Sequence, residues 1–242
     1  EDDEGEGLLM GESYRSDHEE GGGHSGSHSP AVGRRTGSSG SAAASAPNDG
    51  LPSLPPLLES VHASEASSII SQEQMNIIAS FLSESNVSKS WQLTYSLRQH
   101  GASLSTLLSL NAHRSRSGQR AQVPCVIVIE DSWGYVFGGF ISPYVQDRSG
   151  YYGNGESFVF TVVPQPRVYK WTGKNELFAF SDDRCFAMGG GGDGYAVQLD
   201  DELDTGVSNR SDTFGNQVLS SSEFFKCLNV EVWALDMSGF SL

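Results

Sequence analysis

Short apolar segments alternate with turns rich in glycine or aspartate between residues 125 and 235. The apolar segments Cys125–Glu130 and Tyr135–Ile141 flank the turn Asp131–Gly134, which together predict a β-hairpin. Similar segments predict further strands at residues 91–96, 157–163, 167–171, 177–180, 185–188, 195–199 and 226–235. Many short strands at this spacing favour an α+β, mainly β fold: a two-sheet antiparallel β-sandwich with a few flanking helices.

Helical periodicity is confined to the part of the chain before these strands. Apolar residues at Met75, Ile78, Phe81 and Leu82 predict an amphipathic helix from Ser71 to Ser83. Ser71 and Gln74 have the spacing of a capping box, which marks a helix start. A short second helix is expected at residues 104–110, and the arginine-bearing segment 111–122 is expected to be an exposed basic loop.

The first 60 residues contain one of the chain's 24 aromatic residues, Tyr14, but 11 of its 28 glycines. A segment that cannot bury apolar surface cannot offset its chain entropy. We therefore expect residues 1–62 to be a disordered acidic tail rich in Gly, Ser and Pro, and residues 63–242 to form one domain. The LPSLPPLL stretch at residues 51–58 is either a polyproline docking segment or a linker whose leucines pack on the domain edge.

The net charge of −15 narrows the classes of partner. Nucleic-acid binding requires a cationic surface, which neither the tail nor the domain offers, so we expect no nucleic-acid partner. No apolar run approaches the roughly 20 residues of a membrane helix, so we expect no direct membrane insertion. Three cysteines without CxxC spacing are typical of reduced thiols, which predicts a cytoplasmic protein. We expect it to be a monomer.

Two conspicuous motifs have structural explanations. The run Gly189–Gly194 matches G-x-G-x-x-G, but a strand follows it, whereas a dinucleotide site needs a helix there. We interpret the run as positions that require positive φ or a close backbone approach. The acidic residues Asp200–Asp204 lack the glycine and glutamate of an EF-hand loop, so a solvated turn is favoured over a cation site. We expect no cofactor and no metal.

No catalytic set can be assembled from the sequence. There is no G-x-S-x-G motif, and Cys185, after a polar turn, is the best candidate for an exposed thiol. Glu156 and Glu231 are possible acid–base carboxylates, but their separation is not encoded in the sequence. Glu231 lies between valines, so we expect it to face outward or to pair with an arginine. Glu156 is expected to hydrogen-bond loop amides.

Seven strings, in this order, resemble the TLDc domain family, and the resemblance covers residues 68–237. They are WQLTYSLRQHGASLSTL, VIVIEDSWGYVFGGFIS, YGNGESFVFT, YKWTGKNELF, FAMGGGGDGYAVQLDDEL, DTFGN and VEVWALD, which begin at residues 91, 126, 152, 169, 186, 212 and 230. The resemblance implies a two-sheet β-sandwich with flanking helices, a link to oxidation resistance, and binding to the vacuolar-type proton-pumping ATPase that adjusts pump assembly and activity. No accepted reaction comes with the domain.

The resemblance also marks positions as partner-binding or motif residues. For most of them, maintenance of the fold is favoured over direct partner contact, and the two tryptophans are expected to pack in the core or at its edge. The positions are Gly138, Gly139, Gly153, Gly155, Glu156, Trp171, Gly173, Gly189, Gly190, Gly191, Gly192, Phe214, Gly215, Asn216, Glu231 and Trp233.

Two hypotheses of function follow. The first is a non-catalytic module that docks on cytosolic subunits of the vacuolar-type ATPase and is recruited through them to vacuolar or endolysosomal membranes. The alternative is an oxidation-defence protein with thiol-based or hydrolytic chemistry of its own, for which Cys185 and Met188 beside the glycine run are the candidates.

Overall fold

The computed structural model describes residues 60–111, 123–145 and 148–236 of the chain. The expected disordered tail (apart from its last residues), the LPSLPPLL stretch and nearly all of the expected basic loop lie outside these residues. Val61 is already buried, and its amide donates to Asn76 Oδ1 over 2.9 Å. Contacts with the domain therefore begin before the expected boundary at residue 63.

The described residues form eleven strands, all paired antiparallel. The strands are β1 Ser90–Ser96, β2 Cys125–Asp131, β3 Val136–Ile141, β4 Arg148–Tyr152, β5 Phe158–Val163, β6 Arg167–Lys170, β7 Ala179–Ser181, β8 Cys185–Met188, β9 Val197–Asp200, β10 Thr205–Val207 and β11 Phe224–Asp236.

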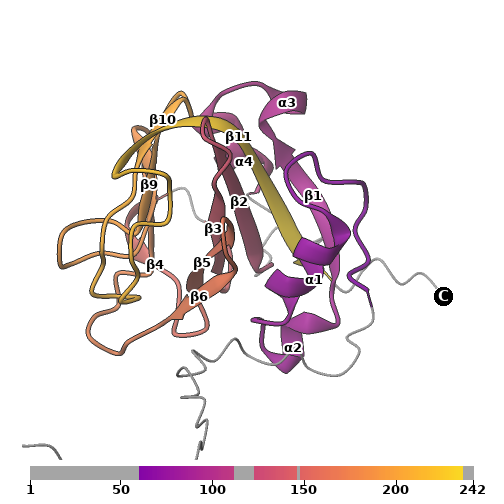
Figure 1. The fold of residues 1–242 in the computed structure, drawn as a ribbon, viewed down its shortest axis with the longest axis horizontal. Coiled ribbons are helices and arrows are strands. Elements are labelled where there is room, and N and C mark those ends of the chain that lie inside the picture. The colour runs from indigo at the N-terminus through magenta and orange to yellow at the C-terminus, as the bar shows by residue number, and fades with distance from the viewer. Residues whose placement is uncertain (1–59, 112–122, 146–147, 237–242) are drawn as a thin grey trace, which may run out of the picture. The chain divides into compact units, whose positions relative to one another are not determined.

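The strands form two layers that share β11. In the order β4-β7-β8-β9-β10-β11-β2-β3-β5-β6, β11 pairs with β10 from Phe224 to Lys226 and with β2 from Cys227 to Ala234. β1 pairs with β11 along its second half. We call β1, β2, β3, β5, β6 and the end of β11 the first layer, and β4, β7, β8, β9, β10 and the start of β11 the second layer. Figure 1 shows β11 crossing from one to the other. The predicted two-sheet sandwich is confirmed.

Alternate residues of β2 face two different cores. Ile127 and Ile129 pack in the sandwich interior, where they belong to the same cluster as Phe186 of β8. Val126 and Val128, with the rest of their cluster, lie on the opposite face of the first layer. Because the strand is buried on both faces, its sequence is a continuous apolar run rather than an alternating one.

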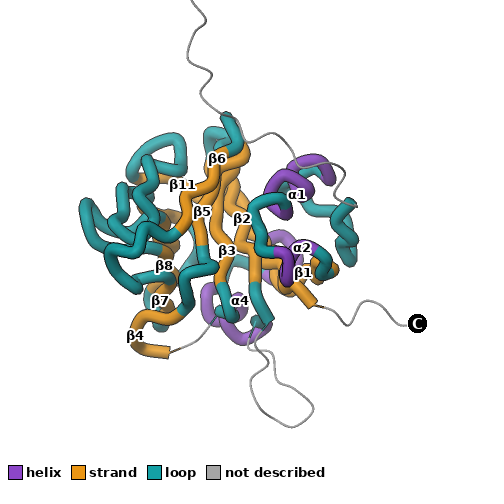
Figure 2. Tube along the Cα trace, turned by 90° about the horizontal axis from the view of Figure 1, so that it is seen from below, coloured by secondary structure: helices purple, strands orange, loops and turns teal. Residues whose placement is uncertain are grey.

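Two helices, α1 (Gln72–Ala79) and α2 (Glu84–Val87), lie on the outer face of the first layer, and Figure 2 shows them on the side of β2, β3 and β5 away from β7 and β8. The buried leucines of α4 (Leu104–Leu110) pack instead in the sandwich interior. Met75 and Ile78 of α1 join the outer core. The four helices in the described residues are α1 Gln72–Ala79, α2 Glu84–Val87, α3 Leu97–His100 and α4 Leu104–Leu110.

The start of α1 was predictable, but its end was not. Ser71 and Gln74 form the predicted capping box, each side chain bonding the other's backbone amide. The helix stops at Ala79 instead of reaching residue 83, because the amides of Phe81 and Leu82 bond to carbonyls three residues back in a tighter turn. Phe81 still reaches the outer core, where its ring contacts that of Phe158 edge-on at 6.3 Å.

Several of the shortest strands and helices were not predicted from the sequence. The short strands β4 and β10 and the one-turn helices α2 and α3 were not predicted, and β7 begins two residues later than expected. Elements of three to five residues carry too few periods to be recognised, and tertiary pairing decides them. Among the described residues, no helix has the length and hydropathy needed to cross a membrane.

Candidate functional site

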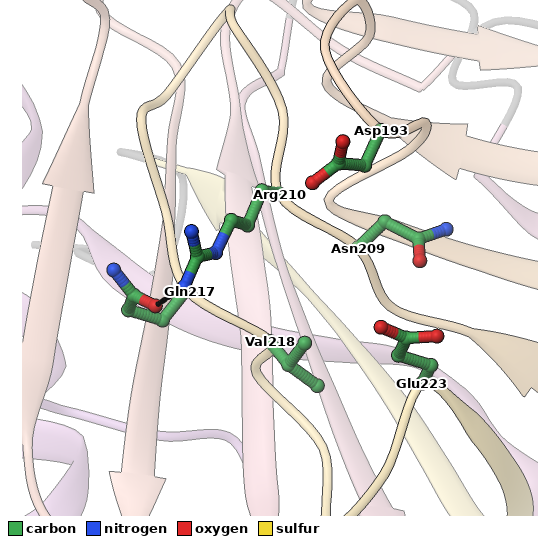
Figure 3. A pocket seen from close by; sticks show the side chains of 6 residues that line it. All are labelled: Asp193, Asn209, Arg210, Gln217, Val218 and Glu223. Carbon is green, nitrogen blue, oxygen red and sulfur yellow. Dashed lines mark hydrogen bonds between the residues drawn. The ribbon is translucent and has the colours of Figure 1, made fainter. Parts of the chain in front are cut away.

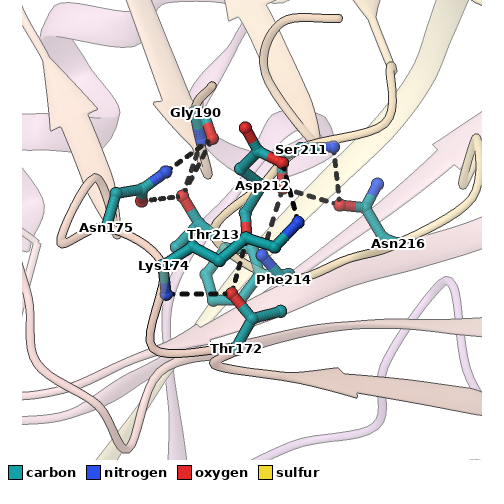
Figure 4. Close-up of polar contacts among 9 residues, drawn as sticks. All are labelled: Thr172, Lys174, Asn175, Gly190, Ser211, Asp212, Thr213, Phe214 and Asn216. Carbon is teal, nitrogen blue, oxygen red and sulfur yellow. Dashed lines mark hydrogen bonds and ion pairs between the residues drawn. The ribbon is translucent and has the colours of Figure 1, made fainter. Parts of the chain in front are cut away.

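Three loops that carry family motifs meet through the polar contacts drawn in Figure 4. They comprise residues 171–177, 189–194 and 208–217. Thr213 links all three: its hydroxyl lies 2.6 Å from Asn175 Oδ1 and accepts a hydrogen bond from the amide of Gly190 over 2.9 Å. The fold therefore brings together motif strings that are separated by up to 40 residues in the sequence, such as Thr172 and Asp212.

The glycine run has both of the properties predicted for it. Gly189, Gly191 and Gly192 have φ values of 74°, 73° and 67°, which residues other than glycine rarely adopt. A Cβ on Gly192 would lie 3.2 Å from the carbonyl oxygen of Arg210, which is the close backbone approach, and a Cβ on Gly190 would lie 2.8 Å from a methyl carbon of the Leu177 side chain. The run is thus shaped to let neighbouring loops approach.

The DTFGN string, residues 212–216, is held by hydrogen bonds within its own loop and by burial. Asn216 is buried; its Oδ1 accepts from Ser211 Oγ over 2.7 Å, and its Nδ2 donates to the carbonyl of Asn209 over 2.7 Å. Phe214 is buried in the sandwich core, and Gly215 has a φ of 61°. These motif residues have their contacts inside the protein.

Trp171 lies at the edge of this loop cluster. Its indole N–H donates to the carbonyl of Asn175 over 2.7 Å, and its ring is 5.4 Å from that of Phe178. A Cβ on Gly155 would come within 2.6 Å of the indole, so that glycine provides the space for the ring. Gly173, with a φ of 80°, makes the turn that follows Trp171.

The turn before β5 adjoins Trp171. Gly153 has a φ of 111°, and a Cβ there would lie 2.7 Å from Phe178 Cβ. Glu156 accepts from Ser142 Oγ over 2.9 Å rather than from the expected loop amides. Gly153 therefore leaves room for Phe178 beside Trp171, whereas Glu156 ties the turn to Ser142 after β3.

Gly138 and Gly139 lie elsewhere, inside β3. A Cβ on Gly138 would lie 1.9 Å from the carbonyl oxygen of Ile127 on β2. A Cβ on Gly139 would point across the sandwich and lie 2.4 Å from Met188 Sδ. Both positions maintain close packing, one between neighbouring strands and the other between the layers.

Glu231 is buried, which corrects the expectation that it faces outward or pairs with an arginine. Its Oε1 accepts from the amide and hydroxyl of Ser68, both over 2.7 Å. Its Oε2 accepts from Ser67 Oγ over 2.5 Å and from Trp233 Nε1 over 3.2 Å. Trp233 is also buried. The carboxylate thus binds the segment before α1 to β11.

Glu156 and Glu231 do not form a carboxylate pair. Glu156 precedes β5, whereas Glu231 is on β11, and β2 and β3 lie between these strands. In the acidic turn, Asp200 accepts from the amides of Asp204 and Thr205 over 2.9 and 3.0 Å. Its carboxylate therefore stabilises the backbone of the turn.

The cysteine thiols are poorly suited to nucleophilic chemistry. Burial raises the pKa of Cys125 to about 12, and burial with nearby carboxylates raises the pKa of Cys227 to about 12. The pKa of Cys185 is also raised, by burial first and then by the charge of Asp182. Because the thiolate is the nucleophile, a raised pKa suppresses the reaction near neutral pH.

These shifts predict that stability falls in alkali. In the unfolded chain the thiols titrate near 9.0, and in the folded chain Cys125 and Cys227 titrate near 12. The protonated thiols contribute fully to the free energy of unfolding below pH 9. Between pH 9 and 12 this free energy falls by up to about 1.4 kcal/mol per pH unit for each thiol. Urea unfolding between pH 8 and 10.5 measures it, with Cys125→Ala as the control that reduces the slope. An equal slope in that variant contradicts the assignment.

A cavity of about 530 Å³ lies beside the loop cluster, lined by Asp193, Asn209, Arg210, Gln217, Val218 and Glu223. Figure 3 shows the carboxylates of Asp193 and Glu223 projecting into it, and the Arg210 guanidinium donating to Gln217 Oε1 over 3.0 Å. None of these residues was singled out from the sequence, because scattered polar loop residues carry no spacing pattern.

Large apolar side chains that the sequence analysis did not single out are exposed near the start of β11. Trp133, Phe224 and Leu228 have 81%, 76% and 54% of their surface exposed. Trp133 could have been recognised, because an indole within a tight turn has few neighbours that can bury it. Phe224 and Leu228 belong to an apolar strand, and only the observed register shows that they face outward.

Comparison with known proteins places this fold in a family. A family model described as the TLDc domain matches residues 63–236, which include all eleven described strands. Oxidation resistance protein 1 is 39% identical over 171 residues in Bos taurus and 38% identical over 173 residues in Homo sapiens, which are 71% and 72% of this chain. Nuclear receptor coactivator 7 of Homo sapiens is 37% identical over 146 residues, or 60% of this chain.

The matches span only 19% of the two oxidation resistance proteins and 15% of the coactivator. They therefore concern one domain of longer proteins. Since the family model covers most of the chain and the motif strings lie where they build the sandwich and its loops, the chain belongs to the TLDc domain family.

Proposed function

We propose that this domain is a non-catalytic binding module that docks on the cytosolic sector of the vacuolar-type proton-pumping ATPase. It regulates the assembly or activity of the pump, in a role linked to resistance to oxidative stress. The protein acts in the cytoplasm and reaches vacuolar or endolysosomal membranes through the pump. Membership of the TLDc family supports this proposal, as does the name of the related oxidation resistance proteins.

The observation that carries the proposal is how the motif residues are used. The polar groups of Thr213 and Asn216 form hydrogen bonds within the loop cluster, and the glycines leave space for neighbouring atoms. Side chains that are hydrogen-bonded inside the protein shape a fixed surface and are not free to act as catalytic groups. The thiol alternative loses support because the pKa of its candidate, Cys185, is raised.

The test is co-sedimentation of the full chain with purified cytosolic sector of the pump. We expect binding at low salt that weakens as salt rises, because residues 61–242 carry 12 basic and 19 acidic residues and complementary charge steers association. ATP hydrolysis by the pump, with and without the chain, reports regulation. Failure to co-migrate at low salt, with the chain shown to be folded, overturns the proposal.

A separate assay distinguishes the alternative. Peroxide turnover by the purified chain that disappears in Cys185→Ser would establish thiol chemistry and displace the binding module. We expect no turnover above that of free cysteine, since the pKa of the Cys185 thiol is raised.

A further inference from the structure

We propose that the start of β11 and the adjoining β2–β3 turn form a docking surface for a partner segment that carries an apolar side chain between basic ones. We call it the β11 surface and define it by Trp133, Phe224, Lys226 and Leu228. The identity of the partner rests on the proposed function; the location and chemistry of the surface rest on the observations below.

The backbone of β11 directs these side chains outward. Phe225 and Cys227 are buried in the sandwich core, so Phe224 and Lys226, which alternate with them, face solvent. The pairing register with β2 shifts between Cys227 and Asn229, and Leu228, at this bulge, also faces outward. Leu228 thus continues the alternation in which Phe224 and Lys226 are exposed and Phe225 and Cys227 are buried.

Trp133 is held beside the strand by a rigid turn. The amide of Ser132 donates to the carbonyl of Lys226 over 2.9 Å. The buried Asp131 accepts from the amides of Trp133 and Tyr135 through Oδ1, both over 2.9 Å, and from that of Ser221 through Oδ2. A large aromatic side chain on a fixed backbone loses little entropy on binding, and such residues dominate interface energies.

The two layers differ in how their outer faces are covered. The outer face of the first layer packs against α1, whose Met75 and Ile78 are buried. Within the described part of the chain, Phe224 and Leu228 have no such cover and keep more than half of their surface exposed. Clustered exposed apolar side chains with a polar rim are typical of interaction sites.

The charge around the β11 surface selects the occupant. The exposed acidic residues Asp201, Glu202 and Asp204 lie in the turn before β10, whose Asp204 carbonyl accepts from the amide of Cys227 over 2.7 Å. Lys226 Nζ lies 3.5 Å from the Asp204 carboxylate. Glu223, immediately before Phe224, lines the cavity with Asp193 (Figure 3).

This acidic rim fits lysine or arginine side chains on either side of an apolar residue. It disfavours an acidic segment. It also disfavours a second copy of this chain, whose net charge is −15.

The first test uses the full chain and purified cytosolic sector of the pump. Trp133→Ala and the double variant Phe224→Ala/Leu228→Ala should each weaken binding about tenfold or more, because exposed aromatic anchors give losses of this size. Asp201→Lys/Glu202→Lys should weaken it at low salt and less at high salt. The matched controls are Leu110→Ala on α4, where 40% of the leucine is exposed, and Glu73→Lys/Glu84→Lys on α1 and α2.

Controls that weaken binding as much as the surface variants would overturn the proposal. So would surface variants that bind like wild type, although the proposed function would then survive.

The second test does not depend on the pump. A short leucine–lysine peptide is titrated into the 15N-labelled full chain, and a peptide with glutamate in place of lysine is the matched control. We expect the lysine peptide alone to shift the Trp133 indole N–H and the amides of residues 223–228. Both shifts should disappear in Phe224→Ala/Leu228→Ala.

Shifts elsewhere, equal shifts from both peptides, or no shifts contradict the β11 surface. If the lysine peptide binds there while wild-type chain fails to bind the pump, the surface stands and the proposed partner falls.

Discussion

Replacing Gly138 with alanine is expected to destabilise the sandwich by about 3 kcal/mol or more. The added Cβ would lie 1.9 Å from the carbonyl oxygen of Ile127 and 2.9 Å from its carbonyl carbon. Both are backbone atoms of β2, which pairs with β3 through residues 125–130 in the middle of the first layer. A rotamer change cannot relieve the clash, so the two strands must separate or shift.

The experiment is urea unfolding followed by circular dichroism, and the matched control is Gly139→Ala. That Cβ would meet Met188 Sδ at 2.4 Å, but the methionine side chain is flexible and can move aside. We expect a smaller loss for Gly139→Ala. Equal losses, or less than about 1 kcal/mol for Gly138→Ala, would show that β2 and β3 tolerate a side chain between them. A variant that never becomes soluble is compared by pulse proteolysis of the freshly translated chains.

Gly138 and Gly139 illustrate how much of the fold is readable from the sequence. The long apolar segments around them predicted β2, β3 and β5 nearly to the residue, because strands of six or seven residues carry a clear pattern. The glycines themselves indicated a close approach or special backbone, but not the strand or layer that approaches. That information depends on the register of Ile127 with Gly139 and on the packing of the second layer against it.

The candidate site was predictable as a set of loops and not as a set of contacts. The strings around Trp171, the glycine run and Asn216 were each identified, yet their convergence on Thr213 depends on loop geometry. The cavity next to them and the exposed side chains of the β11 surface were missed. Exposure of Phe224 follows from the pairing of β11 with β10, which itself escaped prediction because β10 has only three residues.

The prediction that Glu231 faces outward or pairs with an arginine was wrong for a related physical reason. Between valines in an apolar strand, a carboxylate is ordinarily exposed or paired with a cation, because a buried unpaired charge is costly. Here hydroxyl, amide and indole donors replace the cation, and two of the three donor residues lie 163 and 164 positions earlier in the chain. Pattern within a strand carries no information about donors so remote.

Glu231→Ala is expected to lower the free energy of unfolding by about 3 kcal/mol. The variant removes four hydrogen bonds to a buried carboxylate and leaves the amide of Ser68 and the indole N–H of Trp233 without their acceptor. Glu231→Gln keeps the volume but turns an NH₂ group toward donors, so we expect a loss of intermediate size. Glu202→Ala, at an exposed carboxylate, is the control and should change stability by less than about 0.5 kcal/mol.

The location of the damage separates this role from a general packing defect. Glu231 holds the segment before α1 through Ser67 and Ser68, so the first consequence should be local opening of residues 61–70. Hydrogen exchange should therefore rise at Ile69 and Ile70 before it rises in β2, and limited proteolysis should cut near Ser67 in Glu231→Ala but not in wild type. Uniform loss of protection across both layers would instead make Glu231 a core residue like any other, because only a clamp on this segment predicts that the segment opens first.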